Sequence, residues 1–193
     1  EMVKYYAEYG IYLSPDEIII TAGGSEAVLF AFLACLDPGD EIIVTDPFYA
    51  NYMAFAISVG AVIKSVKTHI ENGFRLPSVE EFEAKITDRT RAILICNPNN
   101  PTGYLYTRKE MQRLRDIVKK HNLFLFSDEV YREFIYTGMP YISAFHLEGI
   151  EENVVLFDSV SKRYSECGTR IGCLCTKNKA VHEAVMKFCQ ARL

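Results

Sequence analysis

Short apolar runs rich in isoleucine and valine alternate with helix-forming stretches along the 193-residue chain. Seven of these runs predict β-strands, over residues 17–21, 41–45, 61–66, 91–96, 123–127, 154–158 and 170–176. Several are apolar almost throughout, which is typical of strands that helices cover on both faces of a parallel sheet. The alternation predicts an α/β fold: a three-layer, doubly wound, mostly parallel seven-stranded sheet.

Helices are expected over residues 25–36, 49–59, 79–86 and 108–121. Capping boxes mark two of the helix starts, Ser78 with Glu81 and Thr107 with Glu110. The stretch after Ser25 is apolar on all sides, so we expect that helix to be deeply buried. Residues 131–153 show no such pattern and are expected to be irregular. Both ends of the chain, residues 1–10 and 179–193, look helical, and we interpret the chain as a piece of a longer protein.

The charge balance argues against two classes of partner. The chain has 21 basic and 25 acidic residues, a net charge of -4, so no basic surplus indicates nucleic acid or an anionic membrane. The longest apolar run, residues 27–36, is about half of the roughly 20 residues that a membrane-spanning helix needs. We therefore expect neither a nucleic-acid nor a membrane partner.

The six cysteines indicate a reducing environment. None forms a CxxC pair, and the four histidines do not cluster near them, so no metal site is expected. Cys173 and Cys175 share one face of a predicted strand, where side chains usually pack rather than bond. Free thiols are typical of the cytosol, which predicts a cytoplasmic protein.

Ligands of a doubly wound sheet bind beyond the carboxyl ends of its strands, so motifs that follow the predicted strands are candidate sites. Gly23, Gly24 and Ser25 follow the first strand and lead into a helix, whose first N–H groups could bind an anion. A tight turn capped by Ser25 explains this motif equally well. The loop Asn-Pro-Asn-Asn-Pro-Thr-Gly, residues 97–103, follows the fourth strand. It is either a rigid platform that aims an asparagine amide inward or a purely structural loop.

Two further motifs carry charge. Asp128 follows the fifth strand, where a buried acid would need a cationic partner, although a helix cap or a surface acid is the alternative. Ser159, Ser161 and Lys162 follow the sixth strand, and Arg170 comes eight residues after the lysine. The Lys162 amine could form an imine and the Arg170 guanidinium could bind a phosphate. The alternative is that these side chains belong to an ordinary solvated surface.

In their order and spacing, the four motifs resemble the signature of the class I/II aminotransferases, pyridoxal-phosphate enzymes of fold type I in the aspartate aminotransferase superfamily. The resemblance runs from the Gly-Gly-Ser turn to the Arg-Ile-Gly after the lysine. It implies that residues 1–193 are the pyridoxal-phosphate-binding large (major) domain, truncated at both ends. The N-terminal segment and the C-terminal small domain would be absent, and with them the arginine that binds the substrate carboxylate. The fragment alone is therefore expected to be inactive.

The resemblance also implies the reaction and the residues that carry it. The expected activity moves an amino group between an amino acid and a 2-oxo acid, in a homodimer with pyridoxal 5'-phosphate as cofactor. Lys162 would form a Schiff base with the cofactor and then carry the substrate proton. Asp128 would pair with the ring nitrogen, while Asn100 and Tyr131 would bind the phenolic oxygen. Lys162, Asp128 and Tyr131 are thus the expected catalytic residues.

The same resemblance places the remaining cofactor contacts. Gly24, Ser25, Ser159 and Arg170 would hold the phosphate, assisted by Ser161. Tyr49 would stack on the ring, with Phe48 as its rival and a plain core aromatic as the alternative.

Two residues depart from the family pattern, and two other functions remain open. Arg163 and Thr169 stand where the family often has a small and a large apolar residue, and neither is expected to touch the motif residues. Carbon–sulfur lyases share the cofactor signature, and a non-catalytic aminotransferase-like binding domain, as in certain transcription regulators, is the third hypothesis.

Overall fold

The computed structural model describes residues 1–192, and Leu193, the last residue of the expected C-terminal helical stretch, lies outside the described residues. One sheet forms the centre, in the strand order β1-β7-β6-β5-β4-β2-β3. Strand β7 runs antiparallel to both of its neighbours, β1 and β6, and the other pairings within residues 1–192 are parallel. The predicted class, an α/β fold with a mostly parallel seven-stranded sheet, is confirmed. Its strands are β1 (Ile18–Thr21), β2 (Glu41–Asp46), β3 (Val62–Lys67), β4 (Thr90–Cys96), β5 (Phe124–Asp128), β6 (Val154–Ser159) and β7 (Gly172–Thr176).

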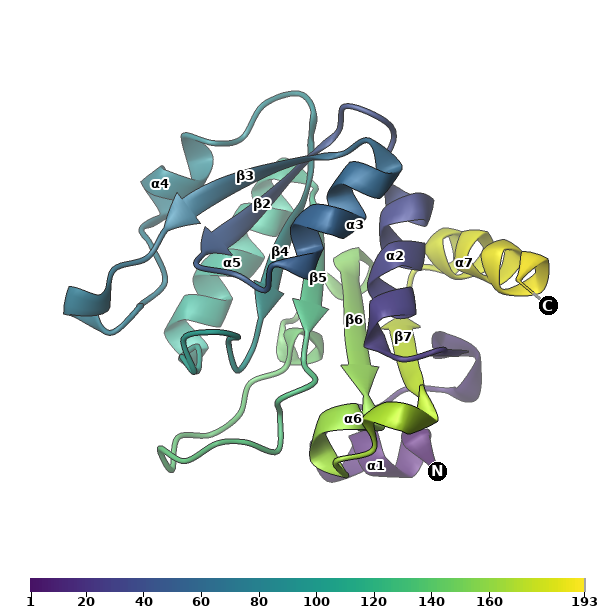
Figure 1. Cartoon of the computed structure of the whole chain (residues 1–193). Helices are drawn as coiled ribbons and strands as arrows, with labels where there is room; N and C mark the ends of the chain where they lie inside the picture. Colours follow the sequence, from purple (N-terminus) through teal and green to yellow (C-terminus); the bar gives the residue numbers. More distant parts are fainter. Residues whose placement is uncertain (193) are drawn as a thin grey trace.

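Helices cover both faces of this sheet, as Figure 1 shows. Alternate residues of a strand point to opposite faces, so Ile93 and Ile95 of β4 join one core while Ala92 and Leu94 join the other. The first core also contains side chains of α1, α4 and α5, and the second contains those of α2, α3 and α7. The helices are α1 (Met2–Glu8), α2 (Gly24–Cys35), α3 (Asn51–Val59), α4 (Val79–Glu83), α5 (Arg108–His121), α6 (Val160–Arg163) and α7 (Lys179–Ala191).

Several local predictions are confirmed and others need correction. Both capping boxes form, and α5 has the predicted boundaries. Helix α4 ends three residues early at Glu83, and α3 begins two residues late at Asn51. Helix α2 is not buried on all sides, because Leu33 remains 38% exposed. The seventh strand was expected to begin at Arg170, but that residue takes a left-handed conformation (φ 54°, ψ 47°) and β7 begins at Gly172.

The expected irregular stretch and the cysteine chemistry also agree with the structure. Residues 131–153 contain only two 3-10 turns, Ala144–His146 and Glu151–Asn153. All six cysteines are free thiols, and the buried sulfur atoms of Cys173 and Cys175 lie 3.8 Å apart. Nowhere in residues 1–192 is a helix both long and apolar enough to cross a membrane.

A close backbone approach at Gly172 brings the turn after β1 against the start of β7. A Cβ atom at this position would lie 2.5 Å from the Gly23 carbonyl carbon, 2.6 Å from the Gly24 nitrogen and 2.8 Å from the Asp158 carbonyl oxygen. These are backbone atoms, which cannot rotate away from a clash. The missing side chain therefore allows the start of α2 to sit beside the end of β6 and the start of β7.

Replacing Gly172 with alanine should lower the free energy of unfolding by about 1–3 kcal/mol, because the new methyl group overpacks against fixed backbone. Urea denaturation of the chain measures this change. The matched control is Gly168→Ala, where an added Cβ meets no atom within 4 Å. The control should change stability by less than about 0.5 kcal/mol. Equal effects at both glycines would contradict the close-approach argument.

Candidate active site

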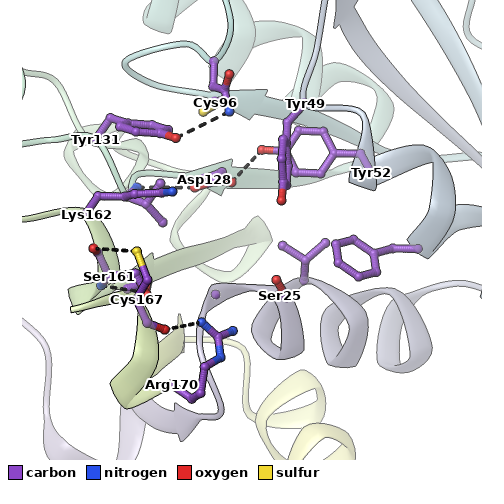
Figure 2. A pocket seen from close by; sticks show the side chains of 16 residues that line it. Ser25, Tyr49, Tyr52, Cys96, Asp128, Tyr131, Ser161, Lys162, Cys167 and Arg170 are labelled. Atoms are coloured by element: carbon purple, nitrogen blue, oxygen red, sulfur yellow. Dashed lines mark hydrogen bonds between the residues drawn. The ribbon is translucent and has the colours of Figure 1, made fainter. Parts of the chain in front are cut away.

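The carboxyl ends of the parallel strands and the start of β7 meet at one edge of the sheet, as expected of a doubly wound fold. The segments that follow these strands enclose a cavity of about 240 Å³, shown in Figure 2. All ten residues predicted to bind the cofactor line this cavity: Gly24, Ser25, Tyr49, Asn100, Asp128, Tyr131, Ser159, Ser161, Lys162 and Arg170.

Asp128 forms the acidic wall of the cavity. It is the last residue of β5 and is 8% exposed. Its Oδ2 accepts a hydrogen bond from the Tyr52 hydroxyl at 2.6 Å, and its Oδ1 accepts one from the Val130 N–H at 3.3 Å. The expected cationic partner is missing, since none of the ion pairs within residues 1–192 includes Asp128. Burial accordingly raises the pKa of this carboxyl to about 6.

Lys162 and Tyr131 lie beside this acid. Ser159 caps α6 by accepting the Ser161 N–H at 3.1 Å, which fixes the turn that carries Lys162. The Lys162 Nζ lies 5.9 Å from the centre of the Tyr131 ring. The Tyr131 hydroxyl accepts a hydrogen bond of 3.5 Å from the Asn100 amide, so the loops after β4 and β5 meet here. Burial is the main cause that raises the pKa of Tyr131, and the nearby Cys96 and Asp128 raise it further.

The opposite wall of the cavity suits an anion. The left-handed conformation of Arg170 places its guanidinium over Gly23, where Nη2 donates to the Ala22 carbonyl at 3.3 Å. Nη1 donates to the Cys167 carbonyl at 3.0 Å, and no carboxylate within residues 1–192 forms an ion pair with Arg170. The start of α2 adds backbone N–H groups at Gly24 and Ser25. A guanidinium and a helix start together form a site for a phosphate-like group.

The structure separates the two candidates for a stacking aromatic. Tyr49 lines the cavity and packs edge-on against Tyr52, with ring centroids 5.4 Å apart. Phe48 does not line the cavity; it packs on the hydrophobic core and stacks on Tyr52 at 6.5 Å. The geometry therefore favours Tyr49 over Phe48.

Sequence reasoning missed six residues that line the cavity: Val28, Tyr52, Phe55, Cys96, Val130 and Cys167. The spacing of three residues between Tyr49 and Tyr52 is a signal that could have identified Tyr52, because the Tyr52 N–H donates to the Tyr49 carbonyl at 3.0 Å in the turn that leads into α3. Its partner Asp128 lies 76 positions away in the chain, so no local pattern indicates the contact.

A buried ionic cluster lies beneath the segments that carry Asp128 and Lys162. Arg132 is 2% exposed and donates to Glu129 at 3.0 Å and to Asp158 at 2.9 Å. Asp158 also accepts the Tyr6 hydroxyl of α1 at 2.9 Å and pairs with Arg163. Glu129 directly follows Asp128, and Asp158 directly precedes Ser159, so the cluster ties both segments to α1.

Arg163 corrects one prediction from the sequence. It was expected not to touch the motif residues, but its Nη2 lies 3.5 Å from the Ser159 carbonyl oxygen and also donates to Asp158. The guanidinium turns away from the cavity because a buried carboxylate and the face of the Tyr5 ring, 4.1 Å away, attract it.

Comparison with known proteins agrees with this geometry. The family model for aminotransferases of class I and II matches residues 1–191. The chain belongs to this family. Members of the family depend on pyridoxal phosphate, so the class I and II aminotransferase assignment also names the cofactor.

Individual aminotransferases give the same result. The chain is 38% identical to the aspartate aminotransferase of Thermotoga maritima over 91% of the chain and 46% of that relative. The crystal structure of aspartate aminotransferase from Thermotoga maritima matches with a TM-score of 0.90 and 36% identity, over 97% of the chain and 49% of that structure. The structure of an alanine aminotransferase from Pyrococcus furiosus matches with a TM-score of 0.89 and 32% identity, over 100% of the chain and 50% of that structure. The chain thus spans about half the length of the relatives it matches.

The residues present fit pyridoxal phosphate. The cofactor carries a reactive aldehyde, a ring nitrogen that can be protonated, and a phosphate. The cavity offers a primary amine at Lys162, a buried carboxylate without a cation at Asp128 and a guanidinium without a carboxylate at Arg170. Each unpaired group of the cavity has a counterpart on the cofactor.

The raised pKa of Asp128 predicts a pH effect on the cofactor-free chain. The folded chain holds this proton up to about pH 6, whereas the usual value for aspartate is 3.8. The stability gained from the bound proton is present below pH 3.8 and is lost as the pH rises through 6, a change of about 3 kcal/mol. Urea unfolding between pH 4 and pH 7 should show that Asp128→Asn removes this loss. An unchanged pH dependence in the variant would contradict the assignment.

Breaking the ionic cluster should unfold the chain more easily. Arg132→Met leaves Glu129 and Asp158 buried without one of their partners, so the free energy of unfolding should fall by about 3–5 kcal/mol. Urea denaturation measures the change, and Lys120→Met, whose side chain is 63% exposed and pairs with Glu83, is the control. The control should show no measurable change. A mild effect of Arg132→Met would show that water reaches the cluster.

Proposed function

We propose that the full-length protein is a pyridoxal-phosphate-dependent aminotransferase that moves an amino group between an amino acid and a 2-oxo acid. The observation that supports this proposal is the single cavity that unites Lys162, Asp128 and Arg170 in a chain of the class I and II family. In this proposal residues 1–193 are the cofactor-binding large domain, and the parts that bind the substrate carboxylate lie outside them.

Each wall of the cavity would hold one part of the cofactor. Lys162 would hold it covalently, Asp128 would face the ring nitrogen, and Arg170 with the start of α2 would bind the phosphate. Ser25, Ser159 and Ser161 would add hydroxyl contacts to the phosphate, Asn100 and Tyr131 would face the phenolic oxygen, and Tyr49 would cover the ring. When bound, pyridoxal phosphate withdraws electrons from the substrate α-carbon and so makes the proton on that carbon acidic.

The chain's own groups would then handle the proton. The Lys162 Nζ is the amine in the cavity, and once free it takes the proton from the substrate α-carbon. Asp128, when ionised, would stabilise positive charge at the ring nitrogen. The attraction is strong because the carboxylate is buried and little water screens it. The apolar side chains of Val28 and Phe55 line the same cavity and would exclude water from part of it once the cofactor is bound.

We also infer that the full-length protein is a cytoplasmic homodimer. Large apolar side chains stay exposed on this chain, among them Tyr12 at 75%, Ile57 at 69% and Tyr136 at 88%. Covering such side chains in a contact with another polypeptide would remove apolar surface from water, which favours association. The free thiols at all six cysteines support the reducing compartment.

Borohydride reduction of the full-length protein with bound pyridoxal phosphate tests the proposal. Reduction should fix the cofactor on the peptide that contains Lys162, as seen by mass spectrometry, and Lys162→Arg should abolish the label. The same variant should lower the rate of amino transfer by at least about 10²–10⁴-fold, because the base is lost. Lys177→Arg, outside the cavity, is the matched control and should keep both the label and the rate.

A second readout separates transfer from elimination. An amino acid should change the absorbance of the bound cofactor, and a 2-oxo acid should restore it. Release of pyruvate or sulfide without this reversible change would support a lyase, and a protein that binds no pyridoxal phosphate would contradict the proposed function.

A further inference from the structure

Tyr52 is not among the residues proposed to contact the cofactor, but it is hydrogen-bonded to Asp128, the acid of the cavity. Its side chain is 1% exposed on α3, and its hydroxyl donates to the Asp128 Oδ2 at 2.6 Å. Figure 2 shows this bond at the wall of the cavity, next to Tyr49. The bond connects the helix after β2 to the end of β5.

The other donors near Asp128 are directed elsewhere. The Cys96 thiol donates to the Pro98 carbonyl at 3.2 Å, and Arg132 donates to Glu129 and Asp158. Within residues 1–192, the Tyr52 hydroxyl is the one side chain that donates a hydrogen bond to the carboxylate. The second oxygen accepts the Val130 N–H, so both oxygens of Asp128 are held and the plane of the carboxylate is fixed.

The packing around Tyr52 fixes the direction of its hydroxyl. Phe48 stacks on its ring at 6.5 Å with an interplanar angle of 16°, and Tyr49 packs edge-on at 5.4 Å. A ring held between two aromatic neighbours cannot turn its hydroxyl away without disturbing the core. The donor is therefore in place before any ligand binds.

The charge on Asp128 needs this donor. The titratable groups near the carboxylate are Tyr52 on α3, Cys96 at the end of β4, Glu129 and Tyr131 after β5, Asp158 near the end of β6 and Lys162 on α6. Burial, and to a smaller extent the negative charge on Asp158 and Glu129, raises the pKa of Asp128, whereas the hydrogen bond from Tyr52 lowers it. Tyr52 thus opposes an environment that favours the neutral acid.

We propose that Tyr52 is a positioning residue that orients the Asp128 carboxylate and keeps it ionised opposite the cofactor's ring nitrogen. The inference rests on the proposed function, because it assigns the ring nitrogen as the group that Asp128 meets. It adds a residue of α3 that acts on the ring nitrogen only through Asp128.

The pH profile of cofactor binding tests this role. The dissociation constant of pyridoxal phosphate is measured on the full-length apoprotein, between pH 5 and pH 8, by quenching of intrinsic fluorescence. Tyr52→Phe removes one hydroxyl and keeps the ring packing. Because binding needs ionised Asp128, loss of the donor should move the acidic midpoint of the profile upward by about one pH unit, which weakens binding about twofold at pH 7 and about tenfold at pH 5.

The matched control is Tyr106→Phe. Tyr106 is 2% exposed, bonds its hydroxyl to Thr45 at 3.1 Å and does not line the cavity, so its profile should match the wild type. In an Asp128→Asn background, Tyr52→Phe should have no further effect on the midpoint, because the group it acts on is gone.

Three results would overturn the inference: an unchanged midpoint in Tyr52→Phe, the same shift in Tyr106→Phe, or a shift that persists in the Asp128→Asn background. If the wild-type protein binds pyridoxal phosphate and Tyr52→Phe shows the same pH profile, the inference fails and the proposed function stands. If the wild type does not bind the cofactor, both fail.

Discussion

Burying a carboxylate without a positive partner is unfavourable, and the cavity is organised around Asp128, which is buried in this way. Its two oxygens are held by a phenol and a backbone N–H, which satisfy hydrogen bonding but leave its charge unbalanced. The result is a pKa of about 6, which is unusual for an aspartate but is expected of a carboxylate whose positive partner is a bound ligand. A protonated ring nitrogen would supply that cation.

The other features of the site serve to place complementary groups around this acid. Parallel strands bring their carboxyl ends to one edge, so segments far apart in sequence, at Ser25, Asn100 and Lys162, meet in one cavity. The absence of a side chain at Gly172 lets the start of α2 approach the end of β6 and the start of β7. The buried cluster of Arg132, Glu129 and Asp158 then ties the segments of Asp128 and Lys162 to α1. Its value lies in geometry, because buried ion pairs add little net stability.

Much of this arrangement could be predicted from the sequence because it follows local rules. Hydrophobic periodicity gave the strands nearly to the residue, and the capping box at Thr107 located the start of α5. The fold class indicated where the four motifs should lie, and the resemblance to the class I/II aminotransferases supplied the roles of their residues and of Tyr49. The left-handed turn at Arg170 was missed, since one of the contacts that accompany it is with Ala22, which is distant in sequence. Tyr52 and the redirected Arg163 were missed for the same reason: their partners are chosen by tertiary packing.

The account depends most on the pairing of Asp128 with the ring nitrogen, and nitrogen NMR of the full-length protein loaded with ring-¹⁵N-labelled pyridoxal phosphate measures it directly. The account predicts a chemical shift typical of a protonated ring nitrogen at neutral pH in the wild type and of an unprotonated one in Asp128→Asn. An unprotonated ring in the wild type, or a protonated ring that does not depend on Asp128, would contradict it.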